Sequence, residues 1–370
     1  METILKFKGP AQVSDITLPP GGQSAVIPLA AGIWEVEIES SYKGGLYAQG
    51  VKSNVEVKPG RTTPCSIQMN YAGGPLHIEG MEWIDAGSFY MGSPGTELLR
   101  GGYEDQHKVT LTQGFYMGKY PVTQKQWEEV MGMDVPLNQV ISASPSFGVG
   151  DDYPMYWVNW YDALVFCNKL SIMEGLTPAY SIYGSTDPAA WGSVPTSLTG
   201  DPDWDAAQII AGSTGYRLPT EAQWEYACRG DYSNKDTETN TMPFGIGDGT
   251  KIKGDMANFD GTYPYDINFP AGEYNDLLGT FLHKTTPVGS YDPNNYGLYD
   301  MHGNVQEWCW DWYDNYSGTA TDPAGAFSGS SRIIRGGIWD DYGQYLRSAC
   351  RGSFIPGNRY ADNGFRLVRP

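Results

Sequence analysis

Glycine and proline limit what this chain can fold into. Its 370 residues include 47 glycines and 25 prolines. Glycine loses more backbone freedom on folding than other residues, and proline interrupts helices and the interiors of sheets. We therefore expect a loop-rich fold with little regular secondary structure, and not a helical bundle. The 12 tryptophans, 12 phenylalanines and 26 tyrosines supply aromatic surface for a core or for binding.

Charge and hydropathy exclude several classes of partner. The chain has 43 acidic and 24 basic side chains and a formal net charge of −19. Such a field repels phosphate backbones and anionic membrane surfaces, so nucleic acid is not an expected partner. No apolar run reaches the ~20 residues that a membrane-spanning helix needs, and no apolar signal segment follows Met1.

The cysteines do not form a local metal or redox motif. None of the five belongs to a Cys-x-x-Cys pair, which excludes a zinc ribbon and a dithiol redox site. An odd count leaves at least one thiol free. Three of them stand beside apolar residues and are predicted to be buried packing residues, namely Cys167, Cys228 and Cys309. The other two are Cys65 and Cys350.

Two domains are predicted. Residues 1–74 contain short alternating strands, such as residues 33–38 and 55–57, separated by Pro-Gly turns. This pattern indicates a small all-β module. Segments rich in tryptophan and glycine begin after Gly73-Gly74, so the second domain is predicted to cover 75–370.

Three helices stand out in the second domain. Thr123 with Gln126, and Thr220 with Gln223, form the capping-box pattern that starts a helix, and Gly132 ends the first of these. Between them, apolar residues over 163–170 recur at helical spacing. Residues 179–213 and 231–292 are predicted to be large ordered loops, and strands are expected at 332–335 and 365–368.

Several blocks, in this order, resemble the formylglycine-generating-enzyme family of sulfatase-modifying proteins. The blocks are Gly87-Ser88-Phe89-Tyr90-Met91-Gly92-Ser93, Tyr120-Pro121-Val122-Thr123, Pro154-Met155-Tyr156-Trp157-Val158, Arg217-Leu218-Pro219-Thr220-Glu221-Ala222-Gln223-Trp224-Glu225, Gly303-Asn304-Val305-Gln306-Glu307-Trp308, Arg335-Gly336-Gly337 and Gly364-Phe365-Arg366-Leu367-Val368. The resemblance covers residues 78–370. It implies an α+β domain with the C-type lectin fold of that family.

The enzyme activity of that family is not expected here. Its redox cysteines lie just after the Gly-Gly strand, but residues 338–346 contain no cysteine. Without thiolates there is no copper site and no thiol for oxygen-dependent chemistry, and Cys350 lies too far along to replace the pair. The four histidines are dispersed, which disfavours the related iron-dependent sulfoxide synthases. The alternative is an oxidase that generates formylglycine, or modifies another substrate, through a divergent site.

A carboxylate-pair mechanism is also weighed. Glu225, Asp311, Glu307 and Asp300 could suggest a glycosidase, but sequence spacing does not fix the separation that such a mechanism requires. With so many acidic residues, chance pairs are expected. No catalytic residue and no catalytic cofactor is therefore predicted.

The C-terminal segment resembles a narrower group, the variable proteins of diversity-generating retroelements. Their frame is matched by Arg335-Gly336-Gly337, Trp339, Arg347-Ser348-Ala349, Arg351, Pro356, Asn358-Arg359 and Gly364-Phe365-Arg366. The resemblance implies a ligand-binding region at about 335–366, with a fixed scaffold that carries exchangeable side chains. The predicted scaffold residues are Trp339, Arg347, Arg351, Arg359 and Phe365.

The predicted variable, ligand-binding positions interrupt that frame. They are Ile338, Asp340, Asp341, Tyr342, Gly343, Tyr345, Cys350, Gly352, Ser353, Phe354, Ile355, Gly357, Tyr360, Ala361 and Asp362. Randomised AAC codons end in C and never encode Lys, Glu, Gln, Met or Trp, and none of these positions carries one of those types. The mixture of Tyr, Gly, Ser and Asp is close to that of antibody loops, which favours a protein ligand. The alternative is that the aromatic members are packing residues.

A structural cation, calcium or magnesium, is expected from the family resemblance. Two side chains and two backbone carbonyls would hold it, from Asp300, Gly303, Val305 and Glu307. The alternative is that Asp300 and Glu307 accept hydrogen bonds from loop amides or arginines.

The resemblance also implies a place for the protein. We expect a receptor-like protein that is exported, displayed at the cell surface and lipid-anchored in its precursor, with the leader absent from this chain. Its partner would be a protein on another cell or surface. None of these patterns predicts an oligomeric state.

Overall fold

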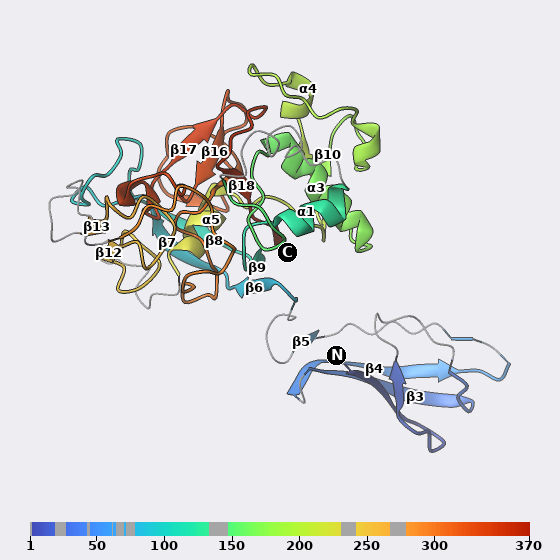
Figure 1. Ribbon diagram of the computed structural model, residues 1–370. Coiled ribbons are helices and arrows are strands. Elements are labelled where there is room, and N and C mark those ends of the chain that lie inside the picture. The colour runs from blue at the N-terminus through green and yellow to red at the C-terminus, as the bar shows by residue number, and fades with distance from the viewer. Residues whose placement is uncertain are drawn as a thin grey trace. The chain divides into compact units, whose positions relative to one another are not determined.

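The computed structural model describes residues 2–18, 27–42, 45–60, 62–63, 70–71, 78–132, 147–230, 242–266 and 279–370 (Figure 1). It divides the chain into two units, 1–77 and 78–370. The boundary predicted after residue 74 lies close to this division, within residues 72–77 that are outside the described ones. None of the described helices has both the length and the apolar character required to cross a membrane.

The first unit is the small all-β module that the sequence predicts. Its antiparallel sheet has the order β2-β1-β3-β4-β5. The strands are β1 Glu2–Lys8, β2 Ile16–Leu18, β3 Gly32–Tyr42, β4 Gly45–Val57 and β5 Asn70–Tyr71. Trp34 and Val36 are buried while Ile33, the residue before Trp34, is exposed, as the alternation in the sequence requires. The indole N–H of Trp34 donates to the carbonyl of Ala30 at 2.8 Å.

Short strands and long connections make up the second unit. Its larger sheet has the order β17-β16-β14-β18, and two three-stranded sheets have the orders β15-β8-β7 and β19-β9-β6. Their strands are β6 Met81–Ile84, β7 Gly87–Met91, β8 His107–Leu111, β9 Phe115–Gly118, β14 Gln306–Trp312, β15 Ala320–Thr321, β16 Arg332–Arg335, β17 Gly352–Phe354, β18 Asn363–Phe365 and β19 Val368–Arg369. The predicted loop-rich α+β architecture is confirmed.

All three predicted helices form. They are α1 Gln124–Met131, α3 Trp160–Met173 and α5 Glu221–Cys228. Thr123 and Thr220 make the predicted capping boxes. A third capping box, between Asn159 and Asp162, starts α3 and was not predicted. In Figure 1 the red strands β16 and β17 lie above the yellow α5, and β18 lies toward the green α1 and α3.

The two predicted loop segments contain small elements. Residues 179–213 include β10 Tyr180–Ser181 paired with β11 Gln208–Ile209, the helix α4 Pro202–Asp205 and the 3-10 turn η2 Pro188–Ala190. Residues 231–292 include the pair β12 Lys251–Ile252 and β13 Tyr265–Asp266. Residues 231–241 and 267–278 lie outside the described residues.

The strand predicted at 365–368 is wrong in one respect, because it is interrupted. β18 pairs in parallel with β14, whereas β19 pairs with β9 in a different sheet. Arg366 lies between them with its side chain buried, and it donates to the carbonyls of Gly118 and Tyr299. The chain leaves one sheet for another at this residue, which alternation in the sequence does not reveal.

The main core lies between α5 and the strands around it. Trp224, Ala227 and Cys228 of the helix pack with residues of β7, β8, β14 and β16. Cys167, Cys228 and Cys309 are buried and free, as predicted, and burial raises the pKa of the Cys228 thiol to about 12. Cys65 lies outside the described residues.

Candidate ligand-binding surface on residues 338 to 362

Buried ion pairs fix the C-terminal segment. The guanidinium of Arg347 is only 2% exposed and donates to Glu97 at 2.6 Å and to Glu104 at 2.7 and 3.0 Å. Arg351 makes two bonds to the Glu221 carboxylate, at 2.6 and 2.8 Å. All the acids are 130 to 250 residues away in the sequence. The segment is thus fastened to the loop before β8 and to the start of α5.

A third pair fastens the far end of the segment. Nε and Nη2 of Arg359 donate to the two oxygens of Asp162, each at 2.7 Å. Asp162 also closes the capping box of α3 with Asn159, whose amide donates to the carbonyl of Gly357 at 3.3 Å. The start of α3 therefore holds both Arg359 and the loop that precedes it.

Two further arginines do similar work although the sequence assigned them no role beyond the frame. Arg335 is paired with Glu225 and donates to the carbonyls of Ser348 and Cys350 at 2.8 and 2.6 Å. Arg366 binds Glu307, with Nη2 to Oε1 at 2.8 Å. Both arginines belong to the blocks that resemble the family, so the resemblance marks them. The sequence does not show which acid each arginine contacts.

The two aromatic scaffold residues are buried in separate places. Phe365 packs edge-on against Phe166 and Trp127 of the helices, with ring centroids 5.2 and 6.2 Å apart. Trp339 is flanked by Phe147 and Phe281 at 5.6 and 6.2 Å. They anchor opposite ends of the loop that carries the candidate positions.

Most of the predicted variable positions reach the surface. Four side chains are exposed, namely Asp340, Tyr342, Tyr345 and Tyr360. Nine are half-buried, namely Ile338, Asp341, Cys350, Gly352, Ser353, Phe354, Ile355, Ala361 and Asp362. These thirteen, called the outward positions below, remain candidates for ligand contact.

Gly343 and Gly357 are corrections to the predicted set, because both are buried. A Cβ at Gly343 would lie 2.7 Å from the backbone nitrogen of Tyr265, and one at Gly357 would collide with the carbonyl oxygen of Ser197. No side chain fits at either position without moving a neighbouring backbone. Both glycines allow the segment to pack closely against a neighbouring backbone. The sequence alone does not distinguish such a structural glycine from a variable position that happens to carry glycine.

Seven outward positions are linked as near neighbours in the chain, by ring contacts, or by the electrostatic coupling of Asp341 and Asp362 with Asp340. The outer strip, defined as Tyr345, Tyr342, Asp340, Asp341, Asp362, Tyr360 and Phe354, is linked by ring contacts at its two ends. Tyr342 stacks on Tyr263 at 4.1 Å and lies 6.4 Å from Tyr345, and Phe354 lies 4.8 Å from Tyr360. The rings are therefore held in place before any ligand arrives.

Three carboxylates lie between these aromatic ends. Burial raises the pKa of Asp341 to about 6, and the nearby Asp362 and Asp340 add to the rise. Burial also raises the pKa of Asp362, with Asp340 again contributing. Asp341 accepts a bond from the backbone N–H of Ile338 at 3.0 Å, so it also shapes the loop.

The predicted cation ligands are only partly suited to a metal. Both oxygens of Glu307 accept bonds from Arg366, and Oε2 also accepts from Trp224 at 2.7 Å. Asp300 accepts from the N–H of Gly289 at 2.7 Å and forms no ion pair with a described residue. Burial raises its pKa to about 6. Glu307 therefore offers no free carboxylate, and a cation at Asp300 stays a prediction.

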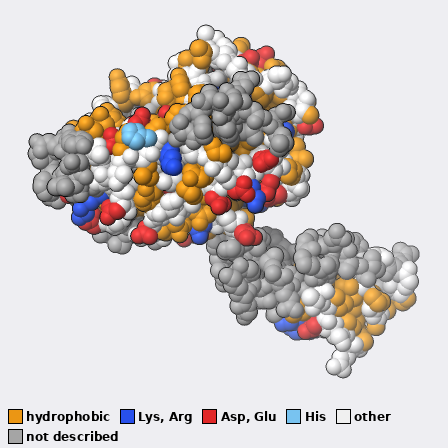
Figure 2. Space-filling view, in the orientation of Figure 1, with side chains coloured by type: hydrophobic (Ala, Val, Ile, Leu, Met, Phe, Trp, Pro, Cys, Tyr) orange, Lys and Arg blue, Asp and Glu red, His pale blue; other side chains and the backbone are white. Residues whose placement is uncertain are grey.

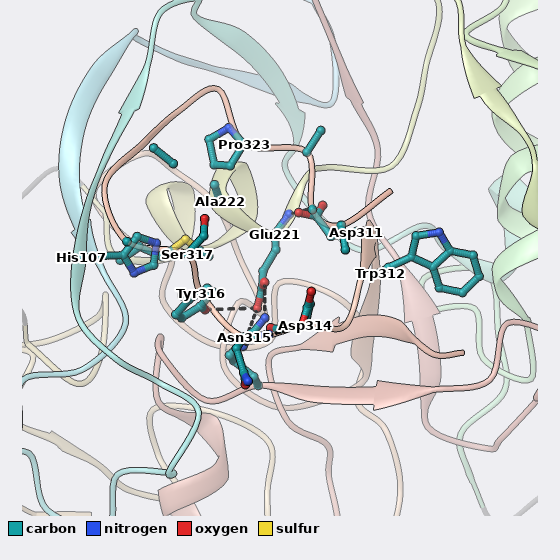
Figure 3. Close-up of a pocket in the computed structure, with 17 residues that line it drawn as sticks. His107, Glu221, Ala222, Asp311, Trp312, Asp314, Asn315, Tyr316, Ser317 and Pro323 are labelled. Carbon is teal, nitrogen blue, oxygen red and sulfur yellow. Dashed lines mark hydrogen bonds and ion pairs between the residues drawn. The ribbon is translucent and has the colours of Figure 1, made fainter. Parts of the chain in front are cut away.

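The acids weighed for glycoside chemistry are bound to arginines or to backbone. Burial favours the neutral form of Glu225, but the guanidiniums of Arg229 and Arg335 outweigh it and lower the pKa of this carboxyl. Asp311 and Glu221 line a cavity of about 290 Å³ (Figure 3). Asp311 accepts from the N–H of Glu221 at 2.8 Å, and Glu221 is taken by Arg351. These groups hold the start of α5 and the segment.

One buried thiol lies beside a histidine. Sγ of Cys228 is 3.7 Å from Nε2 of His302, which also accepts the N–H of Gly245 at 3.0 Å. Nδ1 of His302 lies 2.7 Å from the carbonyl of Leu346, and burial lowers the pKa of His302 to about 4. A neutral imidazole that positions Leu346 leaves the thiol protonated. Among the described residues, no three His, Cys, Asp or Glu side chains are grouped to bind a metal.

Comparison with known proteins agrees with the fold. Residues 72–370 match the sulfatase-modifying factor enzyme 1-like domain family. The chain belongs to this family. Within it, the chain is 34% identical to the chaperone protein LppX of Paenibacillus barcinonensis, over 73% of this chain and 84% of that protein. It is 28% identical to the formylglycine-generating enzyme of Mus musculus, over 80% of this chain and 76% of the enzyme.

A solved structure supports the narrower resemblance. Treponema denticola variable protein 1 is 32% identical, with a TM-score of 0.60, over 78% of this chain and 95% of that protein. The predicted resemblance to a variable protein with this fold is therefore confirmed.

Replacing a frame arginine should cost far more stability than replacing an outward tyrosine. Arg347→Met leaves Glu97 and Glu104 buried without their cation, which should reduce the free energy of unfolding by about 3–5 kcal/mol. Tyr345→Ala, at 46% exposure, should cost less than about 1 kcal/mol. Urea unfolding followed by fluorescence measures both. Equal losses would contradict the division into frame and surface.

A bound cation should depend on Asp300. Calcium should raise the melting temperature of the wild-type protein after chelator treatment, because a cation neutralises this buried carboxylate. The same addition should leave Asp300→Ala unchanged, because alanine offers no side-chain oxygen, whereas the carbonyl of an asparagine is itself a calcium ligand. Asp248→Ala, which removes an exposed carboxylate, is the matched control. If neither chelator nor calcium changes the melting temperature of the wild-type protein, the site is ruled out.

Proposed function

We propose that this chain is a non-enzymatic binding protein whose thirteen outward positions contact a protein ligand and are diversified by a retroelement. One observation carries the proposal. The arginines of residues 335–366 point to acids elsewhere in the domain, while thirteen of the fifteen predicted variable positions between them are exposed or half-buried. A segment built this way can exchange its outer side chains without losing its backbone.

Similarity to Treponema denticola variable protein 1 supports this assignment. The two proteins share 32% identity over most of both chains. The composition of the outer strip also supports a protein ligand, since tyrosine gives large contact area with few rotatable bonds. A backbone fixed in advance keeps the entropy of ordering out of the binding step, which favours affinity.

Formylglycine formation is the second candidate, because the family includes that enzyme at 28% identity. It requires a thiolate pair, and residues 338–346 have none. A reverse transcriptase gene and an adenine-bearing near-copy of the codons for residues 335–366 beside this gene would favour the binding protein. A neighbouring sulfatase gene would favour the enzyme.

Export and display at the cell surface, with a lipid anchor in the precursor, complete the proposal. A receptor with a diversified face meets its ligand only where that ligand is accessible. Labelling of intact cells with an antibody to the outer strip, compared with labelling of lysed cells, distinguishes surface display from an internal location.

A randomised library tests the central claim. Codons that vary the outward positions should yield proteins that mostly fold, with melting temperatures within roughly 5 °C of the wild type, because these side chains are not core. Selection against a purified target protein should return binders. A control library varies Trp339, Arg347, Arg351, Arg359 and Phe365 and should be largely unfolded. If the outward library folds no better than the control, the proposal fails.

A further inference from the structure

The C-terminal segment has a net positive charge by composition, but its arginines and its aspartates differ in whether they have ion-pair partners. Residues 335–366 contain five arginines and three aspartates, with no lysine or glutamate, so the segment is basic as a sequence. A partner chosen from this composition alone would be acidic.

Every one of these arginines is neutralised inside the domain. Arg335 and Arg351 pair with Glu225 and Glu221, Arg347 with Glu97 and Glu104, Arg359 with Asp162, and Arg366 with Glu307. The acids all come from outside the segment. Among the charged groups of the segment, the three aspartates are therefore the ones without an ion-pair partner among the described residues, while Arg359, 27% exposed, is paired with Asp162.

Those aspartates lack such compensation. Asp340 is exposed, and Asp341 and Asp362 are half-buried beside it. Among the described residues, no lysine, arginine or histidine forms an ion pair with any of the three. Mutual repulsion between carboxylates held by a rigid loop is relieved by a cation from outside.

Aromatic rings flank the carboxylates on both sides. Tyr342 and Tyr345 are 41% and 46% exposed at one end of the outer strip, and Tyr360 is 40% exposed at the other. The face of a tyrosine ring attracts ammonium and guanidinium groups, and such attraction adds to that of nearby carboxylates. On the visible face in Figure 2, acidic side chains form several clusters and basic ones are sparser.

We infer that the ligand of this chain presents lysine or arginine side chains to the outer strip, where they meet Asp340 and Asp362 between tyrosine rings. The inference rests on the proposed function, since it describes the partner of the same surface. A protein patch rich in basic residues fits, and an acidic patch is repelled. The aspartates give orientation and association rate, and the rings give contact area.

Binding of a synthetic peptide with alternating arginine and serine tests the inference, with a glutamate–serine peptide of equal length as the comparison. Titration calorimetry of the full chain at physiological salt gives the affinity. Asp340→Asn with Asp362→Asn should weaken the arginine peptide about threefold to tenfold. Glu128→Gln with Glu129→Gln, which removes the same charge from the exposed face of α1, should change it less than about twofold.

The rings have their own matched pair. Tyr342→Phe keeps the aromatic face and should preserve binding, while Tyr342→Leu should weaken it about twofold to fivefold. Unchanged melting temperatures show that each variant is folded.

Equal effects of the two charge variants, or tighter binding of the glutamate peptide, would overturn the inference. The randomised library of the outward positions would still test the proposed function, because its selection step detects binding to a target protein of any charge. If the library fails and the peptide still discriminates, the strip binds cations but is not a diversified surface.

Discussion

Buried pairs between guanidinium and carboxylate groups are the interaction on which the rest of this domain depends. Arg347 with Glu104, Arg351 with Glu221 and Arg366 with Glu307 each join the last strands to an element far away in the sequence. A buried pair adds little net stability compared with apolar packing. The loss of one partner, however, leaves an uncompensated charge buried, which strongly destabilises the fold. The pairs therefore specify one arrangement of loops that short strands alone would leave undetermined.

Much of this architecture could be predicted because it is local. Thr123 and Thr220 mark helix starts through contacts that span three residues, and the apolar alternation around Trp34 marks a strand. The scaffold residues follow from the resemblance to the frame of the variable proteins. Burial of Cys167 and its two counterparts also follows, because their neighbours in the sequence are apolar.

The remainder is non-local, and the sequence is silent about it. Nothing near Glu307 in the sequence shows that Arg366 will occupy both of its oxygens, so it resembles a metal ligand. Gly357 resembles a variable position until the carbonyl of Ser197 is seen against it. The interruption of the strand at Arg366 is also non-local, because β19 pairs with β9, which lies near the start of the domain in the sequence.

The origin of the acidic partners has a consequence for exchange of the tail between proteins. Glu97, Glu104, Asp162, Glu221, Glu225 and Glu307 all lie upstream of the segment that they hold. The C-terminal segment is therefore held by residues that are encoded earlier in the gene. Transplanting residues 335–366 onto a related scaffold requires these six acids in the recipient, in addition to the aromatic contacts that hold Trp339 and Phe365. A recipient that lacks one of them would receive an arginine with no counter-ion.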